Sequence, residues 1–171
     1  MQKKYNDLIK KNIDILEKTF PISGYIPTDK TPYVNITKFA NNYLKKGSKV
    51  LDFGSGPMDK LVILKFMGMK CTAFDDLGDA WHTENTIKKI KKYAKDNDIE
   101  YITTIKEIVK IDDDSLDLVM IHDVLEHLHD SPRKIMELLV SKLKKDGYVF
   151  ITVPNAVNIK KRFAVSHALA L

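Results

Sequence analysis

The apolar residues of this chain follow two patterns that alternate along most of its length. Short continuous apolar runs, typical of strands buried on both faces, occur at residues 50–52, 69–74, 99–103, 116–121 and 148–153. Between these runs, apolar residues recur at helical spacing and predict helices at residues 60–67, 83–97 and 131–147. Residues 105–111 fit either an extension of a strand or a helical turn. Strands that alternate with helices predict an α/β fold, a doubly wound parallel sheet with helices on both faces.

The N-terminal part of the chain shows only the helical pattern. It predicts one amphipathic helix over residues 1–20 and a second over residues 31–46. Proline and glycine interrupt the pattern in residues 22–30, which form either a surface connection or a lid over a site. We expect one structural domain with three parts: an N-terminal helical cap or lid (1–47), a core (48–155) and a C-terminal tail (156–171).

Composition and charge narrow the class of protein. With 171 residues and 44% hydrophobic content, the chain can bury one core. The 28 basic residues exceed the 23 acidic ones only modestly, and no basic cluster has interleaved aromatic residues, so nucleic acid is an unfavoured partner. The single cysteine, Cys71, excludes an internal disulfide and is expected to be buried. No secretory signal or membrane-spanning run is present, and we expect a cytoplasmic protein.

The turn after the first predicted strand is the clearest candidate for binding chemistry. Gly54 and Gly56 follow Asp52 closely and permit a sharp turn that brings bare backbone to a ligand. A carboxylate at the strand end would repel phosphates and suits a ligand that carries a cationic amine. Asp59 stands where the third glycine of the dinucleotide fingerprint would fall. Phosphate binding is therefore the weaker interpretation.

Polar residues also follow the second and fourth predicted strands. Asp75 comes after Asp52 at close to the spacing of about 20 residues at which nucleotide-binding units place a carboxylate on ribose hydroxyls. A turn or helix cap is the alternative role of Asp75. His122 and Asp123 follow the fourth strand. Because ligands of such sheets gather at the carboxyl ends of the strands, we expect these residues to share one site.

Three consecutive aspartates, Asp112–Asp114, offer a different site. Three carboxylates could meet a hard cation. Adjacent side chains of an extended segment point to opposite sides, however, so we favour an acidic turn.

Several motifs in this order resemble the Rossmann-like S-adenosylmethionine-dependent methyltransferases. They cover residues 49–155 and read Val-Leu-Asp-Phe-Gly-Ser-Gly, Phe-Asp, Leu-Asp-Leu-Val, Asp-Val-Leu-Glu-His-Leu, Leu-Lys-Lys-Asp-Gly-Tyr and Val-Pro-Asn. The resemblance implies the strand order 3-2-1-4-5, a cofactor-binding methyltransferase core at 48–155, and S-adenosylmethionine as cofactor with S-adenosylhomocysteine as product. By position it assigns cofactor binding to Asp52, Gly54, Ser55, Gly56, Asp75, Asp76, His122 and Asp123.

The chain departs from the family pattern in two places. Met58 stands where the loop normally has another glycine, which puts the fit of the cofactor in question. The family also adds an antiparallel hairpin after the fifth strand, and we expect this chain, whose sequence runs to Leu171, to lack it. We expect a truncated tail, with strand five exposed, covered by the tail, or used in a dimer.

The implied reaction is transfer of a methyl group from a sulfonium to an oxygen, nitrogen or carbon nucleophile. Positioning supplies much of the acceleration, and a hydroxyl acceptor needs a general base. His127 and His122 are the candidate catalytic bases, although His127 could instead only bond the neighbouring loop.

A metal-dependent variant is the less favoured alternative. Asp123, Glu126 and His127 resemble the acid-x-x-Glu-His cluster that binds a divalent metal in some members of the family. A further ligand downstream would have to be His129 or His167. Our prediction is that the chain has no metal site.

The methyl acceptor cannot be read from any motif. A small molecule, glycan or lipid, methylated on oxygen or nitrogen, is favoured over nucleic acid. The alternative function is a non-catalytic binding or scaffold module. A nicotinamide oxidoreductase would require a third glycine in the loop and no Asp52, and is disfavoured.

Overall fold

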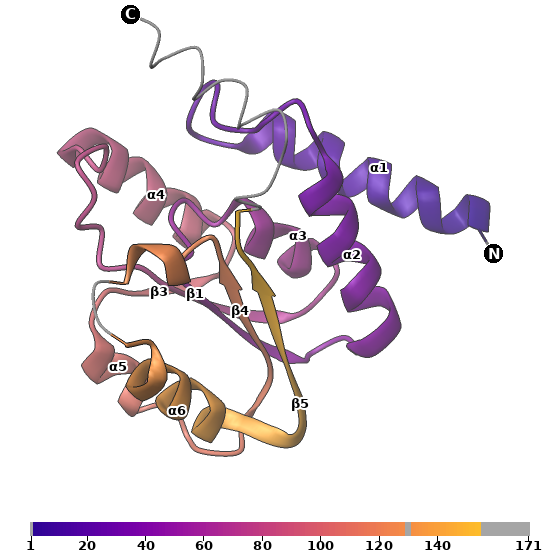
Figure 1. The fold of residues 1–171 in the computed structure, drawn as a ribbon. Coiled ribbons are helices and arrows are strands. Elements are labelled where there is room, and N and C mark those ends of the chain that lie inside the picture. Colours follow the sequence, from indigo (N-terminus) through magenta and orange to yellow (C-terminus); the bar gives the residue numbers. More distant parts are fainter. Residues whose placement is uncertain (1, 129–130, 155–171) are drawn as a thin grey trace, which may run out of the picture.

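The computed structural model describes residues 2–128 and 131–154, and it contains one five-stranded sheet (Figure 1). The strands are β1 (Lys49–Phe53), β2 (Lys70–Phe74), β3 (Glu100–Ile102), β4 (Leu116–His122) and β5 (Leu143–Thr152). Their order is β3-β2-β1-β4-β5, and all four neighbouring pairs are parallel. The predicted fold class and strand order are confirmed.

Helices cover both faces of the sheet, as the alternating pattern predicts. The helices are α1 (Gln2–Thr19), α2 (Thr31–Tyr43), α3 (Asp59–Phe66), α4 (Glu84–Asp96), α5 (Ile105–Val109), the 3-10 turn η1 (Leu125–His127) and α6 (Arg133–Lys142). In Figure 1, α1 to α4 lie on one side of the strands and α5 and α6 on the other. Each side has its own cluster of buried apolar residues. The central strand β1 is therefore buried on both faces, which explains its continuous apolar run.

The structure resolves one segment that the sequence left open and corrects the end of one predicted helix. Residues 105–111, which the sequence left open, begin with a helix because Thr104 and Glu107 form a capping box. The predicted helix over 131–147 is too long, since α6 ends at Lys142 and β5 starts at Leu143. Leu116 pairs with Leu143 but Leu118 pairs with Tyr148, so the residues between are an irregularity of the strand instead of a last helical turn.

The N-terminal helices pack on α3 and help to fix the start of that helix. The Tyr33 hydroxyl of α2 donates a 2.7 Å hydrogen bond to the buried carboxylate of Asp59, the first residue of α3. The Thr19 hydroxyl of α1 lies 3.1 Å from that of Tyr93 in α4. Both contacts tie the N-terminal part to the core on the glycine-loop side of the sheet.

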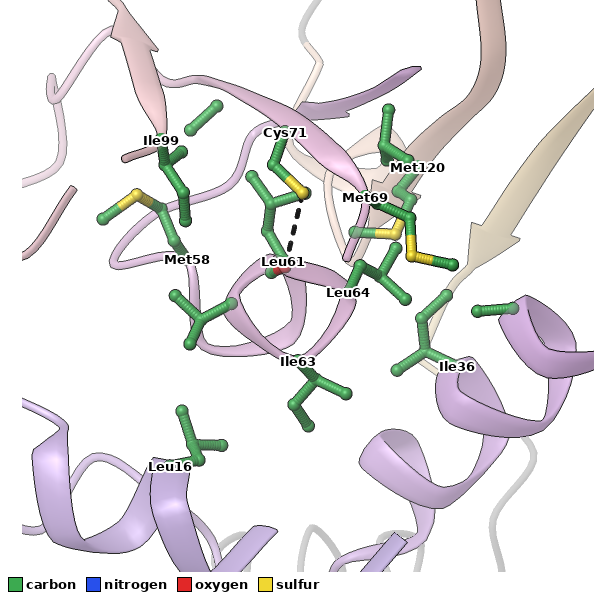
Figure 2. Close-up of a cluster of buried hydrophobic side chains, with 14 of the residues drawn as sticks. Leu16, Ile36, Met58, Leu61, Ile63, Leu64, Met69, Cys71, Ile99 and Met120 are labelled. Atoms are coloured by element: carbon green, nitrogen blue, oxygen red, sulfur yellow. Dashed lines mark hydrogen bonds between the residues drawn. The ribbon is translucent and has the colours of Figure 1, made fainter. Parts of the chain in front are cut away.

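The acidic run forms a turn at the amino end of β4, as favoured from the sequence. The carboxylate of Asp113 forms an ion pair with the ammonium group of the buried Lys142, at 2.6 Å. Asp114 has a positive φ of 52°. Cys71 is also buried as expected, and its thiol donates to the Leu61 carbonyl over 3.8 Å (Figure 2). Burial raises the pKa of this thiol to about 12, so it is unreactive.

Strand β5 forms one edge of the sheet in the described part of the chain. Tyr148, Val149, Ile151 and Val153 are exposed apolar residues there. The predictions about the C-terminal hairpin and the tail at 156–171 concern residues outside the described ones. A dimer through this edge stays a prediction. Within residues 2–128 and 131–154, no helix is long and apolar enough to cross a membrane.

Candidate functional site

A cavity of about 800 Å³ opens at the carboxyl ends of the central strands. Because β2, β1 and β4 are neighbours in a parallel sheet, the loops that follow them meet at this edge. All the site residues predicted from the sequence line the cavity: Asp52, Gly54, Ser55, Gly56, Asp75, Asp76, His122, Asp123 and His127. Its volume lies within the range of roughly 300–1,000 Å³ that is usual for small-molecule sites.

The glycine loop needs both of its glycines, for different reasons. Gly54 has φ 74°, and a Cβ atom there would lie 2.3 Å from Cγ2 of Val124, so no side chain fits against the loop after β4. Gly56 has φ 49°, and a Cβ atom there would meet only the Tyr25 hydroxyl, at 3.8 Å. The first glycine therefore lets two loops pack, and the second leaves bare backbone at the cavity.

Asp75 fastens the loop after β2 to the glycine loop. One carboxylate oxygen accepts a 2.8 Å hydrogen bond from the Gly56 amide, and the other accepts one of the same length from the Leu77 amide. The turn role considered from the sequence is thus present in the structure. A carboxylate offers roughly four acceptor positions, so both oxygens can still accept from ribose hydroxyls in the cavity.

Asp52 near the end of β1 has a buried carboxylate oxygen that lacks a hydrogen-bond donor in the described part of the chain. Only 2% of the residue is exposed, and its Oδ1 has no partner among the residues that the structure describes. Burial raises the pKa of the Asp52 carboxyl to about 7, although the positive charge of Lys60 acts in the opposite direction. An unpaired buried carboxylate is costly, and a bound cation would remove that cost.

Met58, which replaces a glycine of the family pattern, does not narrow the cavity. Its backbone is left-handed, with φ 66° and ψ 22°, the conformation in which glycine is unstrained. Its side chain is fully buried in the core, near Leu61 and Ile99 (Figure 2). The substitution therefore places strain in the backbone and a large side chain in the core, away from the ligand.

His122, a candidate base, is buried and uncharged. Its Nδ1 lies 3.0 Å from the Thr152 hydroxyl of β5, and within the described chain its Nε2 has no partner. Burial, together with the positive charge of Lys60, lowers the pKa of the His122 imidazole to about 3. At neutral pH the imidazole can form a hydrogen bond with a ligand, but it is a weak base.

His127 and Asp123 lie on the loop that follows β4. His127 ends the short turn η1 and is exposed at the cavity wall, and the described side chains form no hydrogen bond with its ring. Asp123 has a positive φ of 53° and its carboxylate lies 3.4 Å from the Thr152 hydroxyl. Within residues 2–128 and 131–154, no three His, Cys, Asp or Glu side chains come together as a metal site would require. Asp123, Glu126 and His127 thus make no such cluster, and His129 and His167 lie outside the described residues.

A profile of the methyltransferase-domain family matches residues 30–168 of the sequence. The chain belongs to this family. A comparison with curated protein sequences gives no match.

Three solved structures illustrate how far the likeness of this methyltransferase domain extends. A proposed S-adenosyl-L-methionine-dependent methyltransferase from Methanococcus maripaludis is 19% identical, with a TM-score of 0.57 over 93% of this chain and 68% of that protein. Two further methyltransferases are crystallised with S-adenosyl-L-homocysteine. The one from Thiobacillus denitrificans is 19% identical, with a TM-score of 0.55 over 92% of this chain and 61% of that protein. The one from Geobacter sulfurreducens is 21% identical, with a TM-score of 0.50 over 82% of this chain and 54% of that protein. At these identities the likeness concerns the fold. The chain spans only 54% to 68% of the three proteins.

The methyltransferase domain has cavity residues that no sequence motif indicates. Tyr25, from the segment between α1 and α2, stacks on Phe20 with ring centroids 5.4 Å apart and faces the glycine loop. Trp81 and His82, from the loop before α4, form another part of the wall. The sequence gives one signal for these cavity residues: tyrosine and tryptophan occur there in segments that lack helical or strand periodicity. The segment 22–30 thus contributes at least one side chain to the site.

Proposed function

We propose that this chain binds S-adenosylmethionine and transfers its methyl group to an acceptor. The observation that carries this proposal is the buried, unpaired carboxylate of Asp52 beside the bare backbone of Gly56. Such a pair suits an amino acid whose ammonium group meets the carboxylate while its chain lies along the loop. The S-adenosyl-L-homocysteine in two of the similar structures supports the same ligand class.

Each end of this ligand has candidate partners in the cavity. Asp52 and the loop of Gly54, Ser55 and Gly56 would hold the methionine part, and Asp75 would hold the ribose hydroxyls. Asp76 is the weaker candidate for the ribose, because one of its oxygens already accepts the Gly78 amide at 2.9 Å and the residue is exposed. His122 and Asp123 would contact the ligand from the end of β4.

The cofactor supplies a sulfonium methyl group, whose carbon–sulfur bond breaks as the bond from the acceptor atom to carbon forms. The chain contributes alignment of the acceptor and removal of water from it. An acceptor that loses a proton also needs a base. We propose His127 for that role, since it is exposed at the cavity, while neutral His122 would orient the acceptor through Nε2.

The acceptor class, the atom methylated and the partners of the protein are proposals as well. We retain a small molecule, glycan or lipid methylated on oxygen or nitrogen, and a cytoplasmic location. A non-catalytic binding module is the second candidate, because the proton acceptor His127 is not held in place by any described side chain. Cofactor binding is common to both candidates, so methyl transfer separates them.

Calorimetric titration with S-adenosylhomocysteine tests the cofactor site directly. We expect micromolar affinity, at least about tenfold weaker in Asp75→Ala because the ribose contact and the Gly56 tether are lost together. Asp117→Ala is the matched control. Asp117 also accepts a backbone amide, that of Lys49 at 2.8 Å, but it lies at the amino end of β4. Absence of binding to a folded chain, or equal affinity of the Asp75 variant and the wild type, would overturn the proposal.

A further inference from the structure

One side of the cavity combines aromatic rings with a carboxylate. Tyr25 and Trp81 have ring centroids 5.9 Å apart at 33°, and Trp81 lies 3.8 Å from the His82 ring. Trp81 is 41% exposed even though it lines the cavity. Asp79 lies on the same turn, where its carbonyl accepts the His82 amide at 2.9 Å. We call these four residues, Tyr25, Asp79, Trp81 and His82, the aromatic rim.

His82 gives the aromatic rim two buried ring nitrogens that lack hydrogen-bond partners among the described residues. The residue is only 9% exposed, and neither ring nitrogen has a partner in the described part of the chain. A buried imidazole without partners is costly. Because the ring lines the cavity, a ligand there can supply the missing hydrogen bonds.

The charge around the cavity decides which ligands fit. Six aspartates and one lysine line it within the described residues: Asp52, Asp59, Asp75, Asp76, Asp79, Asp123 and Lys60. Bound S-adenosylmethionine carries one net positive charge, so the cavity remains negative after the cofactor is bound. A phosphorylated or carboxylated acceptor would be repelled, whereas a cation would be attracted.

Aromatic faces favour the same kind of group. A cation within about 6 Å of a tryptophan or tyrosine ring is attracted to the negative face of the ring. Tyr25 stays neutral, because burial and then the charge of Asp59 raise the pKa of its hydroxyl. The residue is 37% exposed and lines the cavity, so part of it can meet a ligand there.

We propose that the aromatic rim binds a positively charged group of the methyl acceptor, so that the acceptor is a small molecule carrying an amine or ammonium group. This inference rests on the proposed methyl transfer. It narrows the acceptor from any small molecule, glycan or lipid to a cationic compound. Glycans and lipids without a cationic group would bind weakly.

The protein carries its own reporter for a test, because Trp81 is its single tryptophan. Choline is the probe, and 3,3-dimethylbutan-1-ol is its uncharged analogue of the same shape. Both are titrated against tryptophan fluorescence, with and without saturating S-adenosylhomocysteine. We expect choline to quench saturably in both states and to bind about tenfold more tightly than the uncharged analogue.

Variants locate the bound cation. We expect Asp79→Asn to weaken choline binding about threefold to fivefold, and the exposed Asp146→Asn at the far end of β5 to leave it unchanged. By calorimetry, Trp81→Leu should weaken it about tenfold and Trp81→Phe much less, since phenylalanine keeps an aromatic face. These results together would establish the cation site.

Three outcomes would overturn the inference: equal affinity for choline and its analogue, no saturable quenching, or loss of choline binding when S-adenosylhomocysteine is bound. The last result would mean that choline occupies the cofactor position. If S-adenosylhomocysteine itself does not bind, the proposed function fails, and the comparison of the two probes still decides whether the aromatic rim selects cations.

Discussion

The two ends of the sheet have cavities of similar size, but their buried polar groups differ in how far they find partners. A cavity of about 730 Å³ lies at the amino ends of the strands, close in size to the cavity of about 800 Å³ at the carboxyl ends. Three ion pairs lie near the amino end: Lys142 with Asp113 at 2.6 Å, Lys144 with Asp117 at 2.6 Å, and Lys65 with Asp98 at 2.7 Å. Of these three pairs, the last lines the cavity there. At the carboxyl end, atoms of Asp52, His82 and His122 have no partner among the described residues.

This difference indicates which end binds a ligand. Both ends are hollow and rich in aspartate, so neither volume nor composition separates them. Buried polar groups that lack partners cost stability, and they persist where a ligand supplies the partner. Backbone conformation does not separate the two ends, because Met58, Leu77 and Asp123 at the carboxyl end and Asp98 and Asp114 at the amino end all adopt positive φ.

Asp52→Asn should produce the largest effect, because it removes the charge on which the carboxyl end depends. We expect affinity for S-adenosylhomocysteine to fall at least about 100-fold, as for loss of one partner of a buried charged pair. Asp98→Asn is the control, since this exposed residue pairs with Lys65 at the amino end and asparagine tolerates its φ of 51°. Calorimetry that finds equal losses in both variants would remove the contrast between the ends.

The same variant has a predicted pH signature in stability. Burial raises the pKa of Asp52 in the folded chain to about 7, above the value of about 4 expected in the unfolded chain. The folded state then holds the proton more tightly, so the free energy of unfolding of the wild type decreases as pH rises from about 4 to 7. Asparagine does not titrate. Urea unfolding should show that the free energy of unfolding of Asp52→Asn rises relative to that of the wild type as pH rises from about 4 to 7. A difference between the two that does not change with pH would argue against the buried charge.

Lys142→Ala should have the next largest effect, on stability alone. Lys142 is buried, and its ammonium donates to Asp113 at 2.6 Å and to the Val109 carbonyl at 3.1 Å. Removing its stem and both hydrogen bonds is expected to cost about 2–3 kcal/mol of unfolding free energy. The more exposed Lys144→Ala should cost below about 1 kcal/mol. Cofactor affinity should not change in either variant, and a change would link the two ends of the sheet.

Met58→Gly sets two opposing contributions to stability against each other. Loss of the buried side chain costs roughly 2–5 kcal/mol, while glycine relieves about 1 kcal/mol of strain at positive φ. We expect a net loss of about 1–4 kcal/mol in thermal or urea unfolding. Met58→Leu, which keeps the burial and the strain, should lose less than about 1.5 kcal/mol and retain its affinity for S-adenosylhomocysteine. A stabilised glycine variant would show that the strain outweighs the packing.

The order of elements and the position of the site follow from local features of the sequence. Apolar runs bounded by glycine or polar residues determine where β1 to β4 lie, and a parallel sheet then brings the ends of β1, β2 and β4 together. Asp52, Asp75 and His122 could therefore be assigned to one site in advance. The end of α6 could not, because residues 143–147 become extended through pairing with β4.

Tertiary contacts, in contrast, determine which polar groups find partners. Asp113 and Asp52 are both aspartates, and the sequence does not show which of them finds a partner. In the structure Lys142 forms an ion pair with Asp113, whereas Oδ1 of Asp52 has no hydrogen-bond partner among the described residues. Likewise, Tyr25 and Trp81 come from loops far apart in the chain and meet only when those loops fold over the sheet edge. Local sequence determines where strands and turns begin, because neighbouring residues set backbone preferences. Pairing and burial depend on residues distant in sequence, and these leave unpartnered polar groups at the carboxyl end of the sheet, the proposed binding end.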